Sequence, residues 1–312
     1  MKRKIIFHIG LEKTGTDSFQ RFCRHNHQLL LQYGVLYPIQ SFAFAKYNHE
    51  PLVACYLPYP DFSISKSREA RISVIQSLRT EINADIADTI LISAEHFSSR
   101  FTELEIIKLA TDFADYDCRI AIVVREHGSR IYSAYCQSIL SGSHMTIDEF
   151  CDANFHPSCR YARYKETVGL WDHVFGKENV SVFCCNPGEN VIGILCRNLV
   201  SPSMPLATSL SYWDNRSIGL GPAETLRTVN EVIARLPGAA TSYPTWFLLR
   251  HVRRSLGKLL VIVADLKPRG PLRLMSERNR CRLGQIAEAD WIWLKEHHGV
   301  PLPDPGTGMT VP

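Results

Sequence analysis

The chain has 312 residues, of which 45% are hydrophobic and 21% are charged, and its formal net charge is +4. These values are ordinary for a globular protein, and so small a net charge gives no general reason to expect a nucleic-acid partner or stable membrane attachment. The ten cysteines form no repeated C-x-x-C pairs, which argues against a zinc-knuckle or disulfide-rich protein and favours free thiols in a reducing compartment.

Short apolar runs alternate with amphipathic segments over the first 200 residues. Strands are predicted at residues 5–9, 35–37, 89–93, 120–124 and 180–184, and helices at residues 18–32, 66–86, 103–114, around Ser133 and at 157–175. Residues 38–60 are irregular, with a short helix at 51–56. Parallel strands with helical crossovers predict an α/β fold, a doubly wound parallel sheet flanked by helices, with ligand at the carboxyl ends of the strands.

The strand pattern ends near residue 200. Helices are predicted at residues 222–236, 244–256 and 276–298, after a loop at 201–220. No polar linker separates them from the sheet, so we predict one α/β domain over residues 1–300 with a helical C-terminal part. Residues 301–312 form a Pro/Gly tail that is expected to be disordered.

A glycine-rich turn follows the first predicted strand. The run G-L-E-K-T-G-T occupies residues 10–16. A strand, a tight glycine turn and a helix N-terminus together present backbone N–H groups to a phosphate. Lys13 adds a positive charge, and the hydroxyl donors are Thr14, Thr16 and Ser18. The Lys precedes Gly15, whereas in the common P-loop it follows the second Gly. The alternative for this motif alone is a βα turn with a solvated Lys.

A second motif follows the apolar run at residues 120–124. That run ends in Arg125, and after a short Gly-Ser turn Ser133 lies within the next predicted helix. A planar guanidinium suits a phosphate dianion, and a hydroxyl adds one more donor. The alternative is a strand-end Arg in a surface ion pair.

Taken in this order, the two motifs resemble those of sulfotransferases that use 3′-phosphoadenosine 5′-phosphosulfate (PAPS). The resemblance covers about the first 200 residues and implies the P-loop-like sulfotransferase fold. It implies that Lys13, Gly15 and the neighbouring backbone through Ser18 hold the 5′-phosphosulfate, and that Arg125 and Ser133 hold the 3′-phosphate. The run N-R-S at residues 215–217 resembles a late family segment, which would place Arg216 in the phosphate shell. Asp17 stands where the family commonly has Thr or Ser, so a hydroxyl contact from position 17 is not expected.

Sulfuryl transfer to a hydroxyl requires a group that accepts its proton. Glu95 and His96 directly follow the strand at residues 89–93, at the predicted ligand edge. Glu95 is the favoured base and His96 the second candidate, because neighbours on an extended segment point to opposite sides. The alternative is that Glu95 caps a helix or pairs with a Lys. His49, in the irregular segment, is the third candidate, with a surface histidine as its alternative.

The sequence therefore predicts a PAPS-dependent sulfotransferase that acts on a hydroxyl of a carbohydrate or glycolipid, with no metal. An ATP-dependent kinase on a variant phosphate loop and a non-catalytic nucleotide-binding protein of the same fold are the alternatives. A small-molecule or glycan acceptor is the expected partner, with at most transient contact with a membrane surface. The apolar run after the basic residues 2–4 is too short for a signal or spanning segment, so a cytoplasmic, bacterial enzyme is expected.

Overall fold

The computed structural model describes residues 2–42, 47–57, 68–155, 159–186, 189–204, 218, 220–235 and 275–301. They divide into two compact units, the first drawn from residues 1–125, 164–214 and 293–301 and the second from residues 126–163 and 215–292. The prediction of one domain over residues 1–300 stays a prediction. Arg216, the predicted helix at 244–256 and tail residues 302–312 lie outside the described residues.

The first unit is built on a five-stranded, all-parallel sheet in the order β2-β3-β1-β4-β5. Its strands are β1 (Lys4–His8), β2 (Val35–Leu36), β3 (Thr89–Ser93), β4 (Asp117–Val124) and β5 (Val180–Cys184). The central strand β1 pairs with both β3 and β4, and its last residue, His8, lies opposite Ser93 and Ala121. Continuous apolar runs of this kind are typical of parallel strands that are buried on both faces.

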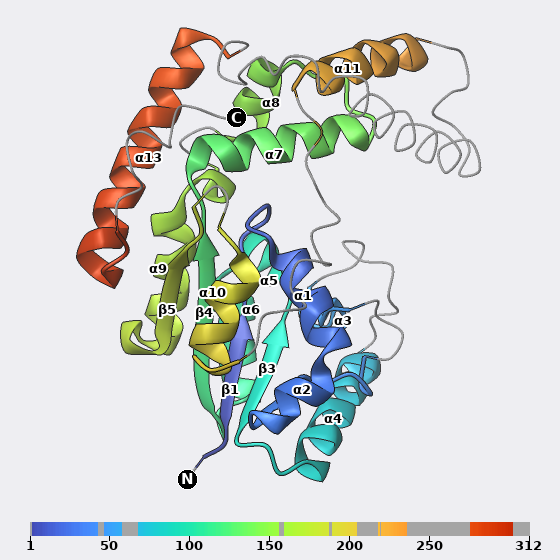
Figure 1. Ribbon diagram of the computed structural model, residues 1–312, viewed down its shortest axis with the longest axis vertical. Coiled ribbons are helices and arrows are strands. Elements are labelled where there is room, and N and C mark those ends of the chain that lie inside the picture. Colours follow the sequence, from blue (N-terminus) through green and yellow to red (C-terminus); the bar gives the residue numbers. More distant parts are fainter. Residues whose placement is uncertain are drawn as a thin grey trace. The chain divides into compact units, whose positions relative to one another are not determined.

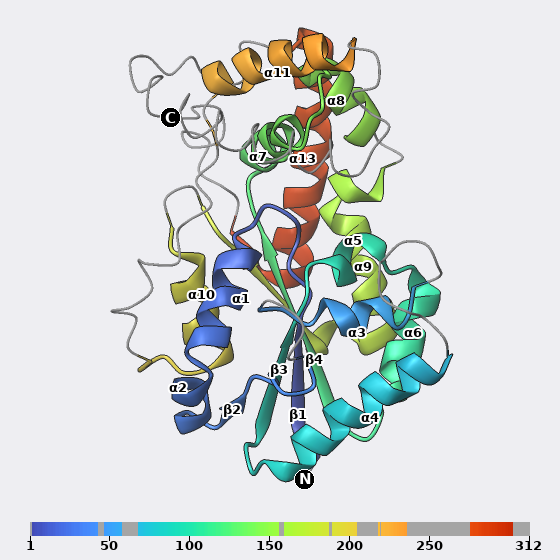
Figure 2. The same ribbon diagram turned by 90° about the vertical axis from the view of Figure 1, so that its right-hand side faces the viewer.

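Helices cover both faces of this sheet, as the edge-on view in Figure 2 shows. One face carries α1 (Thr16–His25), α2 (His27–Gln32) and α10 (Val191–Leu199). The other carries α3 (Glu50–Ala54), α4 (Arg68–Ala84), α5 (His96–Arg100), α6 (Glu103–Asp112) and α9 (Tyr164–Phe175), which a 3₁₀ turn at Lys177–Asn179 connects to β5. The predicted doubly wound α/β fold is confirmed.

Alternate residues of β1 build the two cores. Ile6 belongs to a cluster in which Phe19 and Phe22 of α1 pack with Leu195 of α10. Phe7 faces the other way and makes edge-to-face contacts with Phe97 of α5 and with Phe113, which follows α6. Both cores therefore hold β1 in the centre of the sheet, with its carboxyl end leading into the glycine-rich turn.

The second unit is helical. It contains α7 (His127–Leu140), α8 (Ile147–Asn154), a 3₁₀ turn at Arg160–Ala162, α11 (Leu220–Ala234) and, up to residue 292, α13 (Glu277–His298). Helices α7 and α11 lie side by side (Figure 1), and the Asn230 amide donates to the Ile139 carbonyl between them at 2.8 Å. The Asp148 carboxylate accepts from Ser276 at the start of α13, which fixes that helix against α8.

Several helix boundaries differ from the predictions. The predicted helix at residues 18–32 is two helices, because the backbone of Asn26 leaves the helical region, with φ −109° and ψ 24°, and its side-chain amide donates to the Phe22 carbonyl. The predicted helix at 157–175 begins only at Tyr164. Helices α5, α8 and α10 were not predicted, being five to nine residues long and too short to show a clear period. None of the described helices combines the length and apolar character needed to span a bilayer.

Candidate functional site

Three adjacent strands bring the predicted site residues to one edge of the sheet. The glycine-rich turn at residues 9–15 follows β1, Glu95 follows β3 and Arg125 follows β4. The chain builds β2 and β3 on one side of β1 and then crosses to β4 on the other side. The carboxyl ends of β1 and β4 thus form a topological switch point, the place where doubly wound sheets bind ligands.

The geometry of the turn requires both glycines. A Cβ on Gly10 would lie 2.3 Å from Oγ1 of Thr16, and a Cβ on Gly15 would lie 2.6 Å from Cγ1 of Val191. Gly15 also has a φ of 87°, in the left-handed region that favours glycine. Lys13 adopts φ 68°, an uncommon value for a residue with a side chain. The expectation that Gly10 and Gly15 permit the turn is confirmed.

The hydroxyls of the turn serve the loop itself. The buried Thr14 hydroxyl donates to the Leu11 carbonyl at 2.6 Å, and Thr16 Oγ1 lies 3.3 Å from Thr14 Oγ1. Asp17 forms an ion pair with Arg21 one helical turn on, at 3.1 Å. The Thr14 hydroxyl donates its hydrogen bond within the loop, and its contact with a ligand stays a prediction. The Lys13 side chain and the backbone amides at the start of α1 remain candidates for binding an anion, since a helix's first N–H groups have no acceptor within the helix.

Arg125 contacts the glycine-rich turn directly. Its Nη1 donates to the Lys13 carbonyl at 3.4 Å, and its own carbonyl accepts a short hydrogen bond from the Tyr164 hydroxyl. The structure thus brings two of the predicted phosphate-binding residues together across the switch point. Ser133 lies on α7 in the second unit, so its pairing with Arg125 stays a prediction.

Glu95 and His96 begin a helix. Glu95 is the N-cap of α5, with φ −73° and ψ −38°, and His96 is the first helical residue. The expectation of an extended segment is therefore wrong, because Phe97 and Phe101 bury one side of α5 in the core. Within the described ranges the Glu95 carboxylate makes no capping hydrogen bond and no ion pair, so neither structural alternative for this residue is supported.

The surroundings of Glu95 suit a base that works near neutral pH. Burial raises the pKa of Glu95 to about 7, and the charge of Glu12 contributes to the rise. The positive charges of Lys13 and His96 act in the opposite direction. A carboxylate whose pKa is raised to this range is more basic than an ordinary one and still loses its proton near neutral pH.

His96 is a paired imidazole. Its Nδ1 lies 2.8 Å from Oε2 of Glu50. Burial alone would lower the pKa of His96, but the hydrogen bond and the charge of Glu50 outweigh it and raise the pKa above its usual value. The raised pKa favours the imidazolium form of His96, which cannot accept a proton, and this favours Glu95 over His96 as base.

His49 is buried, so the surface alternative for it is wrong. Its Nδ1 accepts from the Ser93 amide at 2.8 Å, and its Nε2 donates to the Pro38 carbonyl, also at 2.8 Å. Burial lowers the pKa of His49 to about 4. Both ring nitrogens are engaged with backbone groups, so the geometry gives His49 a structural part and not that of a base.

Sequence reasoning missed Glu50. Its Oε1 accepts the amide N–H of Glu95 at 3.0 Å and that of His96 at 3.3 Å. The one available hint was that Glu50 directly follows the candidate His49. However, nothing in the sequence showed that this segment of the chain packs against the end of β3.

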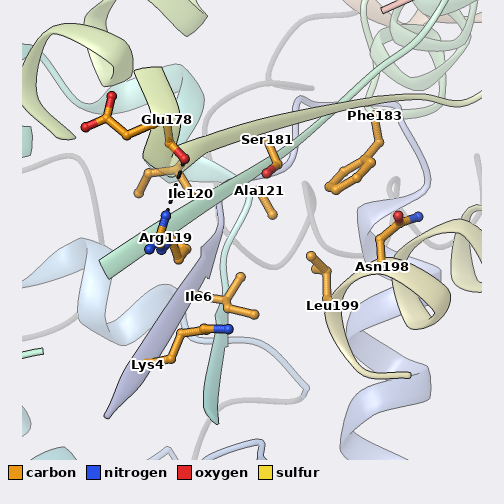
Figure 3. A pocket seen from close by; sticks show the side chains of 10 residues that line it. All are labelled: Lys4, Ile6, Arg119, Ile120, Ala121, Glu178, Ser181, Phe183, Asn198 and Leu199. Carbon is orange, nitrogen blue, oxygen red and sulfur yellow. Dashed lines mark hydrogen bonds between the residues drawn. The ribbon is translucent and has the colours of Figure 1, made fainter. Parts of the chain in front are cut away.

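A pocket of about 250 Å³ also lies on the sheet, at the opposite, amino-terminal half of the strands (Figure 3). Its walls include Lys4, Arg119, Ser181 and Leu199. It is smaller than most ligand sites and contains none of the predicted site residues. No cluster of three potential metal ligands occurs in the described part of the chain.

No family model matches the chain, and no curated protein matches it. Among solved structures, the crystal structure of a sulfotransferase from Alicyclobacillus acidocaldarius resembles it with 14% sequence identity and a TM-score of 0.46, over 97% of this chain and 98% of that chain. A likeness at this level does not assign a family.

Proposed function

We propose that this protein is a sulfotransferase that moves a sulfuryl group from PAPS to a hydroxyl of a carbohydrate or glycolipid acceptor. The observation that carries the proposal is the contact between Arg125 and the Lys13 carbonyl, beside a Glu95 whose pKa is near 7. Phosphate-binding groups and a base then lie at the ends of three adjacent strands. The bacterial and cytoplasmic setting stays a prediction.

The residues fit a bisphosphorylated nucleotide. Gly10 and Gly15 keep the turn free of Cβ atoms that would collide with Thr16 and Val191, so the backbone can curve around an anion. In the proposal Lys13 faces the 5′ end of the ligand, while Arg125 with Ser133 receives the 3′-phosphate. PAPS supplies the sulfuryl group and leaves as 3′-phosphoadenosine 5′-phosphate.

The chain's own groups perform two tasks in the proposed reaction. Glu95 removes the proton from the acceptor hydroxyl as its oxygen forms a bond to sulfur. Lys13 opposes the negative charge that develops on the bridging oxygen as the old S–O bond breaks. The rest of the rate acceleration comes from the alignment of the two reactants by the turn and by Arg125, as in loose phosphoryl transfer.

We expect the protein to bind 3′-phosphoadenosine 5′-phosphate in the presence of EDTA. Titration calorimetry against this nucleotide, against adenosine 5′-monophosphate and against ATP with Mg²⁺ separates the candidate functions. Preference for the bisphosphate without metal supports the sulfotransferase. Binding of ATP alone, and only with Mg²⁺, would indicate the kinase, and tight bisphosphate binding without transfer to any acceptor would indicate the non-catalytic protein.

We expect Arg125→Ala to weaken binding of 3′-phosphoadenosine 5′-phosphate by about 2 kcal/mol, or roughly 30-fold, because a charge-assisted pair is lost. Affinity for adenosine 5′-monophosphate should change little. Arg197→Ala, on an exposed position of α10, is the matched control. A variant at Arg125 that keeps its preference for the 3′-phosphorylated nucleotide would show that this residue does not read that phosphate.

A further inference from the structure

The segment His49–Glu50 binds the chain on both sides of Ala94. The His49 amide donates to the Ser93 carbonyl at 3.0 Å, and the His49 ring accepts from the Ser93 amide. One residue later, the Glu50 carboxylate accepts the amides of Glu95 and His96. Two consecutive residues therefore fix the end of β3 and the start of α5, between which the candidate base lies.

Glu50 also controls the charge beside that base. Its second oxygen, Oε2, pairs with His96 Nδ1, and the Glu50 and His96 side chains are only 18% and 31% exposed. The other charged groups that act on His96 are Glu95 and Glu12, both acidic. Each of them favours the imidazolium, since an opposite charge nearby stabilises the charged form.

We propose that Glu50 is a positioning residue of the candidate site, which holds the turn at Glu95 and His96 and engages the His96 ring through its second carboxylate oxygen, so that Glu95 is left to accept the acceptor's proton. The proton transfer to Glu95 rests on the proposed sulfotransferase function. The pairing of Glu50 with His96 does not depend on that function, and it can be measured without any turnover.

Glu50→Gln tests the proposal because the carboxamide keeps the shape and one acceptor oxygen for the two amides but loses the charge. The titration midpoint of the His96 ring is followed by NMR of its carbon-bound protons, with His96→Gln used to assign the signal. We expect Glu50→Gln to lower the midpoint by about one to two pH units, since burial then acts on His96 without its counter-charge. The matched control is Glu103→Gln, which removes the partner of the exposed His173, 3.2 Å away on the same unit. An unchanged His96 midpoint in Glu50→Gln overturns the proposal.

The second measurement follows the titration midpoint of Glu95, by NMR of its carboxyl carbon, in a set of single and double variants that remove the charges of Glu50 and His96. The charges of Glu50 and His96 act on Glu95 in opposite directions, so removing both should change its titration little. His96→Gln alone leaves Glu50 uncompensated and should raise the Glu95 midpoint, and the double variant Glu50→Gln/His96→Gln should bring it back. If Glu50 had only a structural role, the Glu95 midpoint of the double variant would stay as high as in His96→Gln alone. Failure of nucleotide binding would remove the proposed function while leaving both titrations intact, so the two failures can be told apart.

Discussion

Lys13→Ala is expected to nearly abolish sulfuryl transfer, with a fall in turnover of roughly 10²–10³-fold or more, while the protein stays folded. Lys13 lies in the turn between β1 and α1, and in the described ranges its ammonium group has no ion-pair partner. Its charge acts on Glu95, where it lowers the pKa. A cation that faces the leaving oxygen contributes more in the transition state than in the ground state, because the oxygen gains charge only as the S–O bond breaks.

The measurement separates this role from simple anchoring. Turnover at saturating PAPS and the affinity for 3′-phosphoadenosine 5′-phosphate are determined for Lys13→Ala and for Lys177→Ala, which changes an exposed lysine before β5. The control should match the unmodified protein in both. If Lys13→Ala loses affinity and catalytic efficiency equally while the turnover number is unchanged, Lys13 is an anchor only.

The inner strands could be predicted from the sequence because they are buried on both faces. The apolar run at residues 89–93 matches β3. The run at residues 180–184 matches β5, an edge strand in which only Val180 is fully buried. Helices α5, α8 and α10 were missed because five to nine residues do not establish a helical period. Helix α8 did carry a signal, the capping box of Thr146 and Glu149, which marks a helix start independently of its length.

The candidate site was predicted where it depends on local backbone and missed where it depends on tertiary contacts. Gly10 and Gly15 are required by the turn in which they lie, so the sequence suffices to find them. The burial of His49 and the contacts of Glu50 depend on residues more than 40 positions away, and no spacing rule connects them. The same long-range contacts lie at the start of α5, so the segment after β3 is not extended as predicted. Glu95 is therefore favoured over His96 because His96 pairs with Glu50, and not because the two side chains point to opposite sides.

Glu95→Gln is expected to lower turnover at least about a hundredfold, the usual scale of general-base catalysis, with little change in affinity for 3′-phosphoadenosine 5′-phosphate. The carboxamide keeps the shape of the side chain but cannot accept a proton. Glu105→Gln is a poor control because that residue caps α6, so Glu103→Gln serves instead. We expect Glu95→Gln to stay folded, so unfolding would not account for the lower turnover. Because the pKa of Glu95 is raised in the folded protein, ionising its carboxyl group lowers the stability of the fold as the pH rises from the pKa of the unfolded chain through about 7. The glutamine side chain of the variant carries no such charge, so Glu95→Gln should melt no lower than the parent at pH 8.

The pH dependence gives the sharper test of this assignment. The base must be deprotonated, so the rate should rise with pH through about 7 and level off above it, the direction set by the raised pKa of Glu95. Glu95→Gln should lose this rise together with the activity. Near-full activity in Glu95→Gln combined with a large loss in His96→Ala would instead make the histidine the base, against the pairing with Glu50. If both variants keep their activity, no protein base is needed, as would suit an acceptor amine that binds already deprotonated.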